Sequence, residues 1–340
     1  MISLSVPGRL CLFGEHSDWA GEMRREDPRL APGLCLIAGT DQGITAIAEP
    51  ARRFEIISRL ADDRRPRSFA APADPAALFA AAHADPFFRY AAATAAVLIE
   101  EQRCGGVRIE IRTNDLPMAR GLSSSAAICV LIARAFHLAY RMQLTLEQEM
   151  DLAYRGERAA GSLCGRMDQA CAYGKQPVLL SFDGDAMGVE AITPAAPIEI
   201  LVVDLMHHKD TPRILADLRN AIREDEKLRL ALGSTNLEIV RRARDAVRLG
   251  DAATLGTLMT HAQEIFDRDV APHSPELSAP RLHAVLHFGA ESGLSWGGKG
   301  VGSQGDGCAQ FVCRDLPSRD QLARQITAAG LGRCLPLTLG

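Results

Sequence analysis

The chain contains two carboxylates, Glu157 and Asp168, that stand eleven residues apart (157 to 168) across a predicted loop. An enzyme that transfers phosphate from magnesium-bound ATP needs oxygen ligands for the metal, a cation for developing charge and a group that accepts the substrate proton. We predict Ser125 and Glu157 as the metal ligands. Asp168 is then the candidate proton acceptor, with Arg9 as its cationic partner. Either carboxylate taken alone is more often a surface or helix-capping acid, so the prediction depends on the whole set.

A second group of residues forms a turn that suits an anion. Gly121 stands between a strand-like run and an apolar run, and the three serines 123–125 follow it closely. The first amides of a helix have no intrahelical partner and lie at the positive end of its dipole, so a helix beginning at these serines would favour phosphate. Arg120 adds a full positive charge. The alternative is an ordinary helix cap, because serine is a preferred capping residue.

A third group follows a short buried strand near the start of the chain. Residues 10–13 are all apolar, and Glu15, His16 and Asp18 come directly after them. Three ionisable side chains at the end of a buried strand predict a polar pocket for a hydroxylated ligand; a solvated loop is the alternative. Arg9 precedes the apolar run, and a partly buried cation needs an anionic partner.

Regular elements must position these groups, and the apolar pattern predicts where they lie. A strand is expected at 107–111 and a helix of about four turns at 126–140, so the serine turn joins a strand to a helix. A second helix is expected at 145–158, where a Thr-x-x-Gln pattern is typical of a capping box. This helix carries Glu157 near its end and leads into the glycine-punctuated loop 161–169.

The remaining elements are predicted from the same patterns and from turn residues. Strands are expected at 2–6, 10–13, 34–37, 44–47, 54–57, 177–182, 198–205 and 308–313, and helices at 75–101 and 321–329. The segment 39–43 is expected to be a turn between two of the strands. Two prolines make 191–197 the best linker, which predicts domains at 1–195 and 196–340.

Composition argues against several classes of protein. Of 340 residues, 47% are apolar and 24% charged, and the net charge of −4 gives no reason to expect nucleic acid or a membrane as partner. No apolar run is long enough to span a bilayer, and the first residues lack the basic start of a signal peptide. The nine cysteines include no C-x-x-C pair, which favours reduced thiols over zinc or disulfides. We expect a cytoplasmic monomer or homodimer.

In combination, the motifs resemble those of the GHMP small-molecule kinases, the family of galactokinase, homoserine kinase, mevalonate kinase and phosphomevalonate kinase. Residues 7–18 (Pro-Gly-Arg to Gly-Glu-His-Ser-Asp) look like the first motif of that family, 121–126 like the second and 300–307 like the third. The loop 164–169 (Cys-Gly-Arg-Met-Asp-Gln) is close to the galactokinase form. The spacing of the two candidate carboxylates is similar to that of mevalonate kinase.

The resemblance implies an α+β protein with an N-terminal α/β domain, like ribosomal protein S5 and with a left-handed β-α-β crossover, and a C-terminal ferredoxin-like domain. ATP would lie between them, with Mg²⁺ as cofactor and a small polyhydroxylated molecule as acceptor. The residue roles it implies are catalysis for Asp168 and Arg9; phosphate binding for Arg120, Gly121, Leu122, Ser123, Ser124 and Ser125; metal binding for Ser125 and Glu157; acceptor binding for Glu15, His16, Asp18, Cys164, Gly165 and Asp168; and a third-motif role for Gly300, Gly302 and Gly305.

The third motif departs from the family pattern, which is nearly all glycine. Ser303, Gln304 and Asp306 interrupt it, and Lys299 precedes it. An acidic side chain beside phosphates would be repulsive unless it pointed away or paired with Lys299. The motif also satisfies the dinucleotide fingerprint G-x-G-x-x-G. That fingerprint must open a helix, whereas here it precedes a predicted strand, so a dinucleotide site is not expected.

Histidines and tryptophans give weaker signals. His283 and His287 have i, i+4 spacing on a predicted helix, but the glutamate of the zinc-protease pattern is missing and no third ligand is evident. We expect them to be ordinary surface or core histidines. Trp19 and Trp296 each neighbour a motif, and either packs in the core or stacks on a ligand.

The expectation that follows is an ATP-dependent sugar kinase, with the anomeric hydroxyl as one candidate acceptor. The acidic and imidazole side chains at 15–18 suit a polyol. A mevalonate-type kinase is the alternative enzyme, and its anionic substrate would favour basic side chains instead. A third alternative is a regulator that binds sugar and ATP without catalysis; the complete set of catalytic and metal-binding candidates argues against it.

Overall fold

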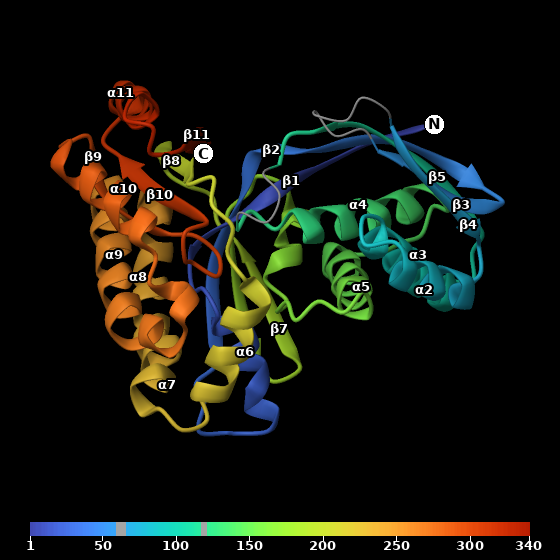
Figure 1. Cartoon of the computed structure of the whole chain (residues 1–340), viewed down its shortest axis with the longest axis horizontal. Coiled ribbons are helices and arrows are strands. Elements are labelled where there is room, and N and C mark those ends of the chain that lie inside the picture. The colour runs from blue at the N-terminus through green and yellow to red at the C-terminus, as the bar shows by residue number, and fades with distance from the viewer. Residues whose placement is uncertain (59–65, 117–120) are drawn as a thin grey trace. The chain divides into compact units, whose positions relative to one another are not determined.

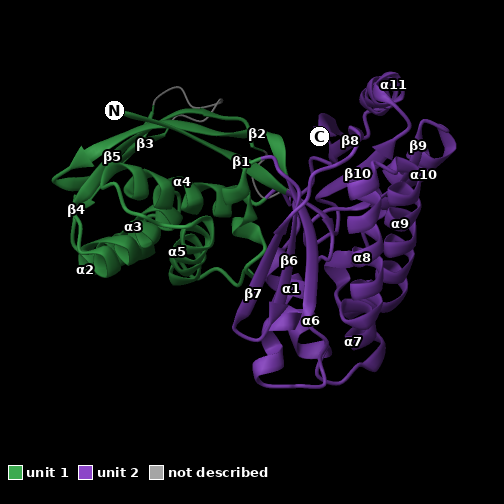
Figure 2. Cartoon of the chain, turned by 180° about the vertical axis from the view of Figure 1, so that it is seen from behind, with its two compact units in different colours: residues 1–9, 39–116, 123–174 green, residues 10–38, 117–122, 175–340 purple. Residues whose placement is uncertain are grey.

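The computed structural model describes residues 1–58, 66–116 and 121–340. The chain is α+β and divides into two compact units (Figure 2): unit 1 holds residues 1–9, 39–116 and 123–174, and unit 2 holds residues 10–38, 117–122 and 175–340. Each unit is therefore assembled from segments that are separated in sequence. A single domain boundary at residue 195 remains a prediction.

Unit 1 combines a sheet with helices that lie on one side of it (Figure 1). Its strand order is β4-β3-β5-β2, in which β3 and β5 are parallel and the other neighbours antiparallel. Its elements are β3 (Arg53–Ser58), β4 (Arg67–Pro72), α2 (Pro75–Ala84), α3 (Arg89–Gln102), β5 (Gly106–Asn114), α4 (Ser124–Ala139), α5 (Leu146–Ala159) and the 3-10 helix η2 (Asp168–Tyr173), with parts of β1 (Ile2–Phe13) and β2 (Gly33–Ala51).

Small residues let the helices of unit 1 pack closely. Helix α3 is rich in alanine and buries the whole run 91–99. A Cβ at Gly156 of α5 would lie 2.3 Å from Oγ1 of Thr94 in α3, so only glycine permits this approach. The contact fixes the end of α5, where Glu157 stands. The predicted capping box is confirmed, because Thr145 and Gln148 exchange side-chain and backbone hydrogen bonds.

Unit 2 contains residues 33–38 of β2, which pair with β6, and a second, four-stranded sheet. The second sheet has the order β11-β8-β10-β9 with every pair antiparallel, which is the ferredoxin-like arrangement that we predicted. Its elements are α1 (Ser17–Glu22), η1 (Met23–Arg25), β6 (Val178–Asp183), β7 (Ala186–Ala191), β8 (Ile198–Asp204), α6 (Thr211–Ala221), α7 (Glu226–Leu232), α8 (Ser234–Leu249), α9 (Ala252–Ile265), the π-helical turn η3 (Phe266–Val270), η4 (Ala271–His273), η5 (Pro275–Leu277), α10 (Pro280–Glu291), β9 (Ser295–Gly300), β10 (Cys308–Cys313), α11 (Leu316–Ala328) and β11 (Arg333–Leu339).

The predicted turn at 39–43 is wrong. Strand β2 runs unbroken through this segment, so the two strands expected there are one. Gly43 serves a different purpose, since a Cβ at that position would lie 2.6 Å from the backbone oxygen of Val6 in β1. A glycine inside a strand can mark a close backbone approach as well as a turn, and the sequence pattern alone does not separate the two.

The elements that carry the motifs are confirmed with small shifts. Strand β5 and helices α4 and α5 lie where they were predicted, as do β8 and β10. Helix α11 begins at Leu316, five residues before the predicted start at 321, because the Asp315 side chain accepts a hydrogen bond from the amide of Ser318 and caps it.

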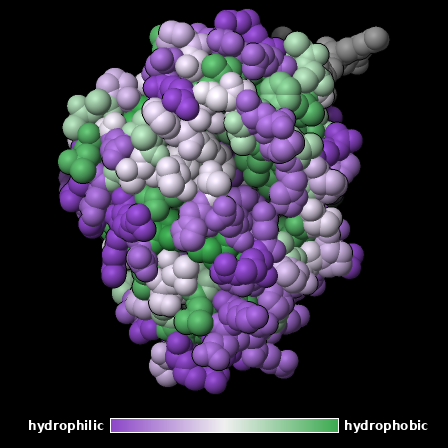
Figure 3. Space-filling view, turned by 90° about the vertical axis from the view of Figure 1, so that its left-hand side faces the viewer, coloured by the Kyte–Doolittle hydropathy of each residue, from purple (hydrophilic) through white to green (hydrophobic). Residues whose placement is uncertain are grey.

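The face of the molecule shown in Figure 3 is mainly hydrophilic, and its hydrophobic residues lie in small separate patches. No helix within the described part of the chain combines the length and hydropathy needed to cross a membrane. All nine cysteines are free thiols, and seven of them are buried.

Candidate functional site

Unit 1 brings together three side chains from distant parts of the sequence. Arg9 comes from β1, Ser123 immediately precedes α4, and Asp168 begins η2. The Arg9 guanidinium donates to Oδ1 of Asp168 and to the Ser123 hydroxyl, and Ser123 Oγ donates to the same Oδ1 at 2.9 Å. Arg9 is 3% exposed and Asp168 21%. A buried cation requires such a partner, so the predicted pairing of Arg9 with Asp168 is present.

Ser123 does not act as an ordinary helix cap. Its backbone is left-handed, with φ of 54°, and its side chain makes no capping hydrogen bond to α4. The hydroxyl is engaged with Asp168 instead. The first amides of this 16-residue helix therefore have no N-cap side chain, and the helix dipole adds positive character at the same point. Both features favour an anion at the start of α4 over the simple cap that was the alternative.

A second cluster in unit 1 surrounds Glu157. This carboxylate is 1% exposed. Oε1 accepts a hydrogen bond from Ser125 Oγ at 2.7 Å, and Oε2 accepts one from Gln169 Nε2 at 2.7 Å. Ser162 Oγ is a more distant donor at 3.4 Å. The predicted pair of metal ligands, Ser125 and Glu157, is thus in direct contact, and Gln169 orients the carboxylate.

Burial raises the pKa of Glu157 to about 7, and the nearby Asp168 carboxylate adds to the effect, while the hydrogen bonds from Ser125 and Gln169 oppose it. A hydroxyl and a buried carboxylate fit Mg²⁺, which takes one or two carboxylates and fills its remaining positions with water and phosphate oxygens. Within the described residues, no group of three His, Cys, Asp or Glu side chains forms a metal site. Two protein oxygens suit a metal that takes its other ligands from water and a nucleotide.

Two residues that the sequence did not single out support the segment bearing Asp168. Glu149 of α5 is 2% exposed and accepts hydrogen bonds from Arg134 of α4 at 2.9 Å and 3.1 Å. Arg134 also donates to the backbone oxygen of Ala172 in η2 at 2.8 Å. The arginine therefore links α4 and α5 to η2. Arg134 and Ala172 are 38 residues apart in the sequence, so this link can be seen only in the folded structure.

Cys164 and Gly165, two of the predicted acceptor residues, are buried in the loop before η2. Burial raises the pKa of the Cys164 thiol, and the Glu157 and Asp168 carboxylates raise it further. The thiol is therefore neutral and packs near the amide of Gln169. Its chemistry suits a structural position better than a nucleophile.

In unit 2, Gly121 of the second motif meets the third motif. Gly121 has φ of 94°, and a Cβ there would lie 3.0 Å from the Val301 backbone oxygen. A Cβ at Gly302 would likewise lie 3.0 Å from the oxygen of Gly121, so the two backbones are in contact. Leu122 is fully buried in the apolar core, which makes it a packing residue. Arg120 lies outside the described residues.

Asp306, the acid that interrupts the third motif, caps a helix. Its Oδ1 accepts hydrogen bonds from the amides of Arg281 and Leu282, at 2.9 Å and 3.0 Å, at the start of α10. An aspartate in this position stabilises the helix end by satisfying free amides and opposing its dipole. The sequence suggested that Asp306 would repel a phosphate. Its carboxylate instead binds the amides at the start of α10. Lys299 does not pair with it.

Lys299 pairs with Glu15 of the first motif. The ammonium group contacts the Glu15 carboxylate and donates to the Gly300 backbone oxygen at 2.9 Å. Both side chains are at most 5% exposed. His16 and Asp18 are also buried, so the solvated-loop alternative for this motif is wrong. The structure places all three predicted acceptor residues of unit 2 in a packed, polar environment.

Lys209 is a further cation that the sequence analysis missed. Its Nζ donates to the backbone oxygen of Gln304 at 2.6 Å and lies 3.6 Å from the position of a Cβ at Gly121. It therefore stands where the second and third motifs meet. The available signal was a basic residue shortly after the buried strand β8.

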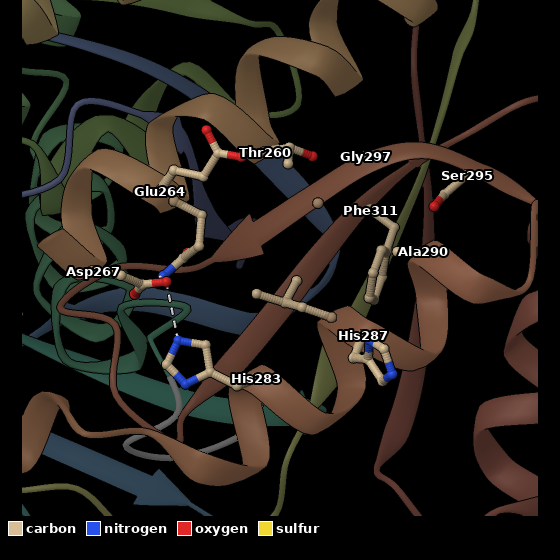
Figure 4. A pocket seen from close by; sticks show the side chains of 12 residues that line it. Thr260, Glu264, Asp267, His283, His287, Ala290, Ser295, Gly297 and Phe311 are labelled. Carbon is tan, nitrogen blue, oxygen red and sulfur yellow. Dashed lines mark hydrogen bonds and ion pairs between the residues drawn. The ribbon is translucent and has the colours of Figure 1, made fainter.

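One pocket lies away from all of these motifs (Figure 4). Its volume is about 260 Å³, and helices α9 and α10 and strands β9 and β10 form its walls. His283 Nε2 lies 3.0 Å from Asp267 Oδ2, and His287 pairs with Glu291. The two histidines are thus surface residues with acidic partners, as expected from the sequence.

The chain is similar in sequence and in fold to known kinases. Residues 89–175 match the model of the GHMP kinases N terminal domain. The chain is 24% identical over 292 residues to a galactokinase of Pyrococcus furiosus. The matched region covers 77% of this chain and 76% of that protein. Among solved structures, Lactococcus lactis galactokinase complexed with galactose has a TM-score of 0.78 at 16% identity, covering 99% of this chain and 93% of that one. L. major mevalonate kinase in complex with R-mevalonate has a TM-score of 0.74 at 17% identity, covering 100% and 96%.

Residues 89–175 therefore form a GHMP kinase N-terminal domain, and the chain has the fold of the GHMP kinases. Members of this family are generally phosphotransferases that use ATP and normally Mg²⁺.

Proposed function

We propose that this chain transfers the γ-phosphoryl group of Mg-ATP to a hydroxyl of a sugar, with the anomeric hydroxyl as the first candidate. The observation that carries the proposal is the pair of clusters in unit 1. Asp168 is held by Arg9 and Ser123, and Glu157 is held by Ser125 and Gln169. Such a pair supplies the positioning and charge that phosphoryl transfer requires.

Asp168 is assigned the acceptor hydroxyl. The hydrogen bonds described for its carboxylate both end on Oδ1, so Oδ2 is the oxygen that would accept the hydroxyl proton. Arg9 compensates the charge of Asp168 and, beside it, the negative charge of the transferred phosphoryl group. Ser123 fixes the orientation of the carboxylate, because its hydroxyl both accepts from Arg9 and donates to Asp168.

Ser125 and Glu157 are assigned the metal. Mg²⁺, when bound, neutralises the phosphate charge that would otherwise repel an approaching hydroxyl. Glu157 must give up its proton to hold the cation, and Gln169 keeps its second oxygen in place. Gly121, Ser123 and Ser124 at the start of α4 would bind the phosphates through backbone amides.

The acceptor is assigned to the first motif. Glu15 and Asp18 offer carboxylate oxygens, and His16 offers a ring nitrogen, which together suit a molecule with several hydroxyl groups. The galactokinase relative supports a sugar. The mevalonate kinase structure is similar in fold alone, so mevalonate stays an outcome of the test.

A coupled assay that measures ADP release over a panel of acceptors tests this function. The panel contains hexoses, heptoses, uronic acids, mevalonate and homoserine, with a control that lacks any acceptor. We expect release to depend on one class of sugar, and the product to carry the phosphate. Turnover with mevalonate or homoserine alone, or no acceptor-dependent release at all, would contradict the proposal.

A further inference from the structure

His16 is held between two aromatic residues of unit 2. It immediately precedes α1, and its side chain is almost fully buried. The Trp19 indole Nε1 donates to His16 Nδ1 at 3.2 Å, with the two ring centroids 5.9 Å apart and nearly perpendicular. The Phe266 ring stacks on the imidazole with centroids 6.1 Å apart. The ring of His16 is therefore fixed in position by its neighbours.

The bond from Trp19 determines where His16 carries its proton. An indole N–H can only donate, so the nitrogen that receives it must hold a lone pair. Nδ1 of His16 is consequently bare, and the single proton of the neutral ring is on Nε2. A protonated imidazolium would place an N–H on Nδ1 directly against the indole N–H. Protonation of His16 must therefore break this hydrogen bond.

Trp19 is itself rigid. Its side chain is 2% exposed, and the Arg219 guanidinium of α6 lies over the indole with its central carbon 5.4 Å from the ring centroid. The burial of the ring and the cation over its face both disfavour rotation of the indole away from His16. The donor is thus presented to His16 in one orientation.

Charged groups near His16 in the fold also bear on whether its ring is protonated. Among the described residues, Glu15, Asp18 and Glu22 are the carboxylates of its own segment, Lys299 of β9 pairs with Glu15, and Arg219 of α6 lies over Trp19. The ionisable residues that follow Phe266 are engaged elsewhere, Asp267 with His283 and Arg268 with Asp269. Nearby carboxylates favour a charged imidazole, and the indole N–H opposes it.

We propose that Trp19 is a positioning residue that holds His16 as the neutral Nε2–H tautomer, so that His16 serves the acceptor site as a hydrogen-bond donor and not as a base or a cation. The relevance of this tautomer to catalysis rests on the proposed function. Carboxylates only accept hydrogen bonds, whereas a sugar presents oxygens that need a donor. His16 supplies that donor beside Glu15 and Asp18, and the acceptor class is therefore one with a hydroxyl or ring oxygen to receive it.

The test compares Trp19→Phe with Trp296→Phe, the other tryptophan of the chain. Phenylalanine keeps an apolar ring but removes the N–H. Trp296 is 39% exposed and lies under Arg314, so its replacement controls for the loss of an indole. Nitrogen-15 spectra of histidine-labelled full-length protein report the protonation of each ring nitrogen between about pH 5 and 8. The His16 signals are assigned by their absence in His16→Gln.

We expect Nδ1 of His16 to stay unprotonated across this range in the wild type and in Trp296→Phe, and to become protonated on acidification in Trp19→Phe. We also expect kcat/KM of Trp19→Phe to fall about tenfold for each pH unit below about 6.5, a decline absent from the control. A wild-type spectrum in which Nδ1 carries a proton overturns the proposal, whether or not the variant folds. An unchanged titration in a folded Trp19→Phe protein does the same. The spectra need no turnover, so failure of the proposed kinase activity is separate from failure of this inference.

Discussion

Glu157 and Asp168 are both carboxylates of unit 1, yet their surroundings differ. Asp168 has a guanidinium partner and is partly exposed, whereas Glu157 is buried with only neutral donors. Burial therefore raises the pKa of Glu157 to about 7. Because the folded-state pKa is raised, protonation of Glu157 stabilises the metal-free protein. That contribution is complete below the ordinary value of 4.5 and is lost as the pH rises through about 7.

The raised pKa of Glu157 predicts a magnesium requirement that depends on pH. Below about pH 7 a proton competes with the metal for the carboxylate, so the Mg²⁺ concentration for half-maximal rate should be about fivefold higher at about pH 6 than at about pH 7. Magnesium titrations of the kinase rate at about pH 6 and about pH 7, with ATP saturating, measure this.

Glu157→Gln provides the matched control, since an amide does not titrate and its weak magnesium requirement should be the same at both pH values. Equal half-saturating concentrations in the wild type at the two pH values would remove Glu157 from the metal site.

At the residue scale, the sequence predicted the partners whose pairing is enforced by burial. A cation at the start of an apolar strand must meet an anion, and Asp168 was the candidate for Arg9. The same argument did not predict the partner of Lys299. That partner, Glu15, is 284 residues away and lies in a motif for which a solvated loop was the alternative. Lys209, Arg134 and Glu149 were missed for a similar reason. Their partners are backbone oxygens or buried acids that no local pattern indicates.

At the element scale, strand β9 is tied to the segment before α1 by the Glu15–Lys299 pair. Removing one partner of a buried ion pair leaves an uncompensated charge, so Lys299→Met should lower the free energy of unfolding by about 3–5 kcal/mol. The double variant Glu15→Gln with Lys299→Met should recover much of that loss, because the stranded charge is gone. Urea unfolding of the two variants measures both values.

An exposed pair of unit 2 supplies the control for this prediction. Arg223 and Glu26 are 66% and 70% exposed, and Arg223→Met should change stability by less than about 1 kcal/mol. A Lys299→Met protein as stable as that control would show that the buried pair contributes nothing, and a double variant no more stable than Lys299→Met would refute the stranded-charge explanation.

Elements with a clear period were predictable, and those governed by tertiary contact were not. Helix α5 carries its capping box and an amphipathic pattern in the sequence itself. Strand β2 does not, because Gly39 and Gly43 resemble turn residues while β1 requires the close approach at Gly43. Strand β4 also escaped prediction, because its six residues (Arg-Ser-Phe-Ala-Ala-Pro) do not alternate between apolar and polar side chains.

At the scale of the whole molecule, the sequence predicted the fold through the order of its motifs. The ferredoxin-like sheet and the α+β class are confirmed, and the family model and relatives agree with them. The compact units are less simple than one cut at residue 195. Strands β1 and β2 each contribute residues to both units, so the segments of a unit alternate along the chain. Nothing in local composition marks such alternation.

The central claim is that Asp168 handles the acceptor hydroxyl, and Asp168→Asn tests it most directly. The amide has the same shape but cannot take a proton, so kcat for the sugar found in the acceptor screen should fall by about 10² or more. Dissociation constants for ATP and for the sugar should stay near the wild-type values, because the binding groups are intact. A variant that keeps the wild-type kcat would contradict the account.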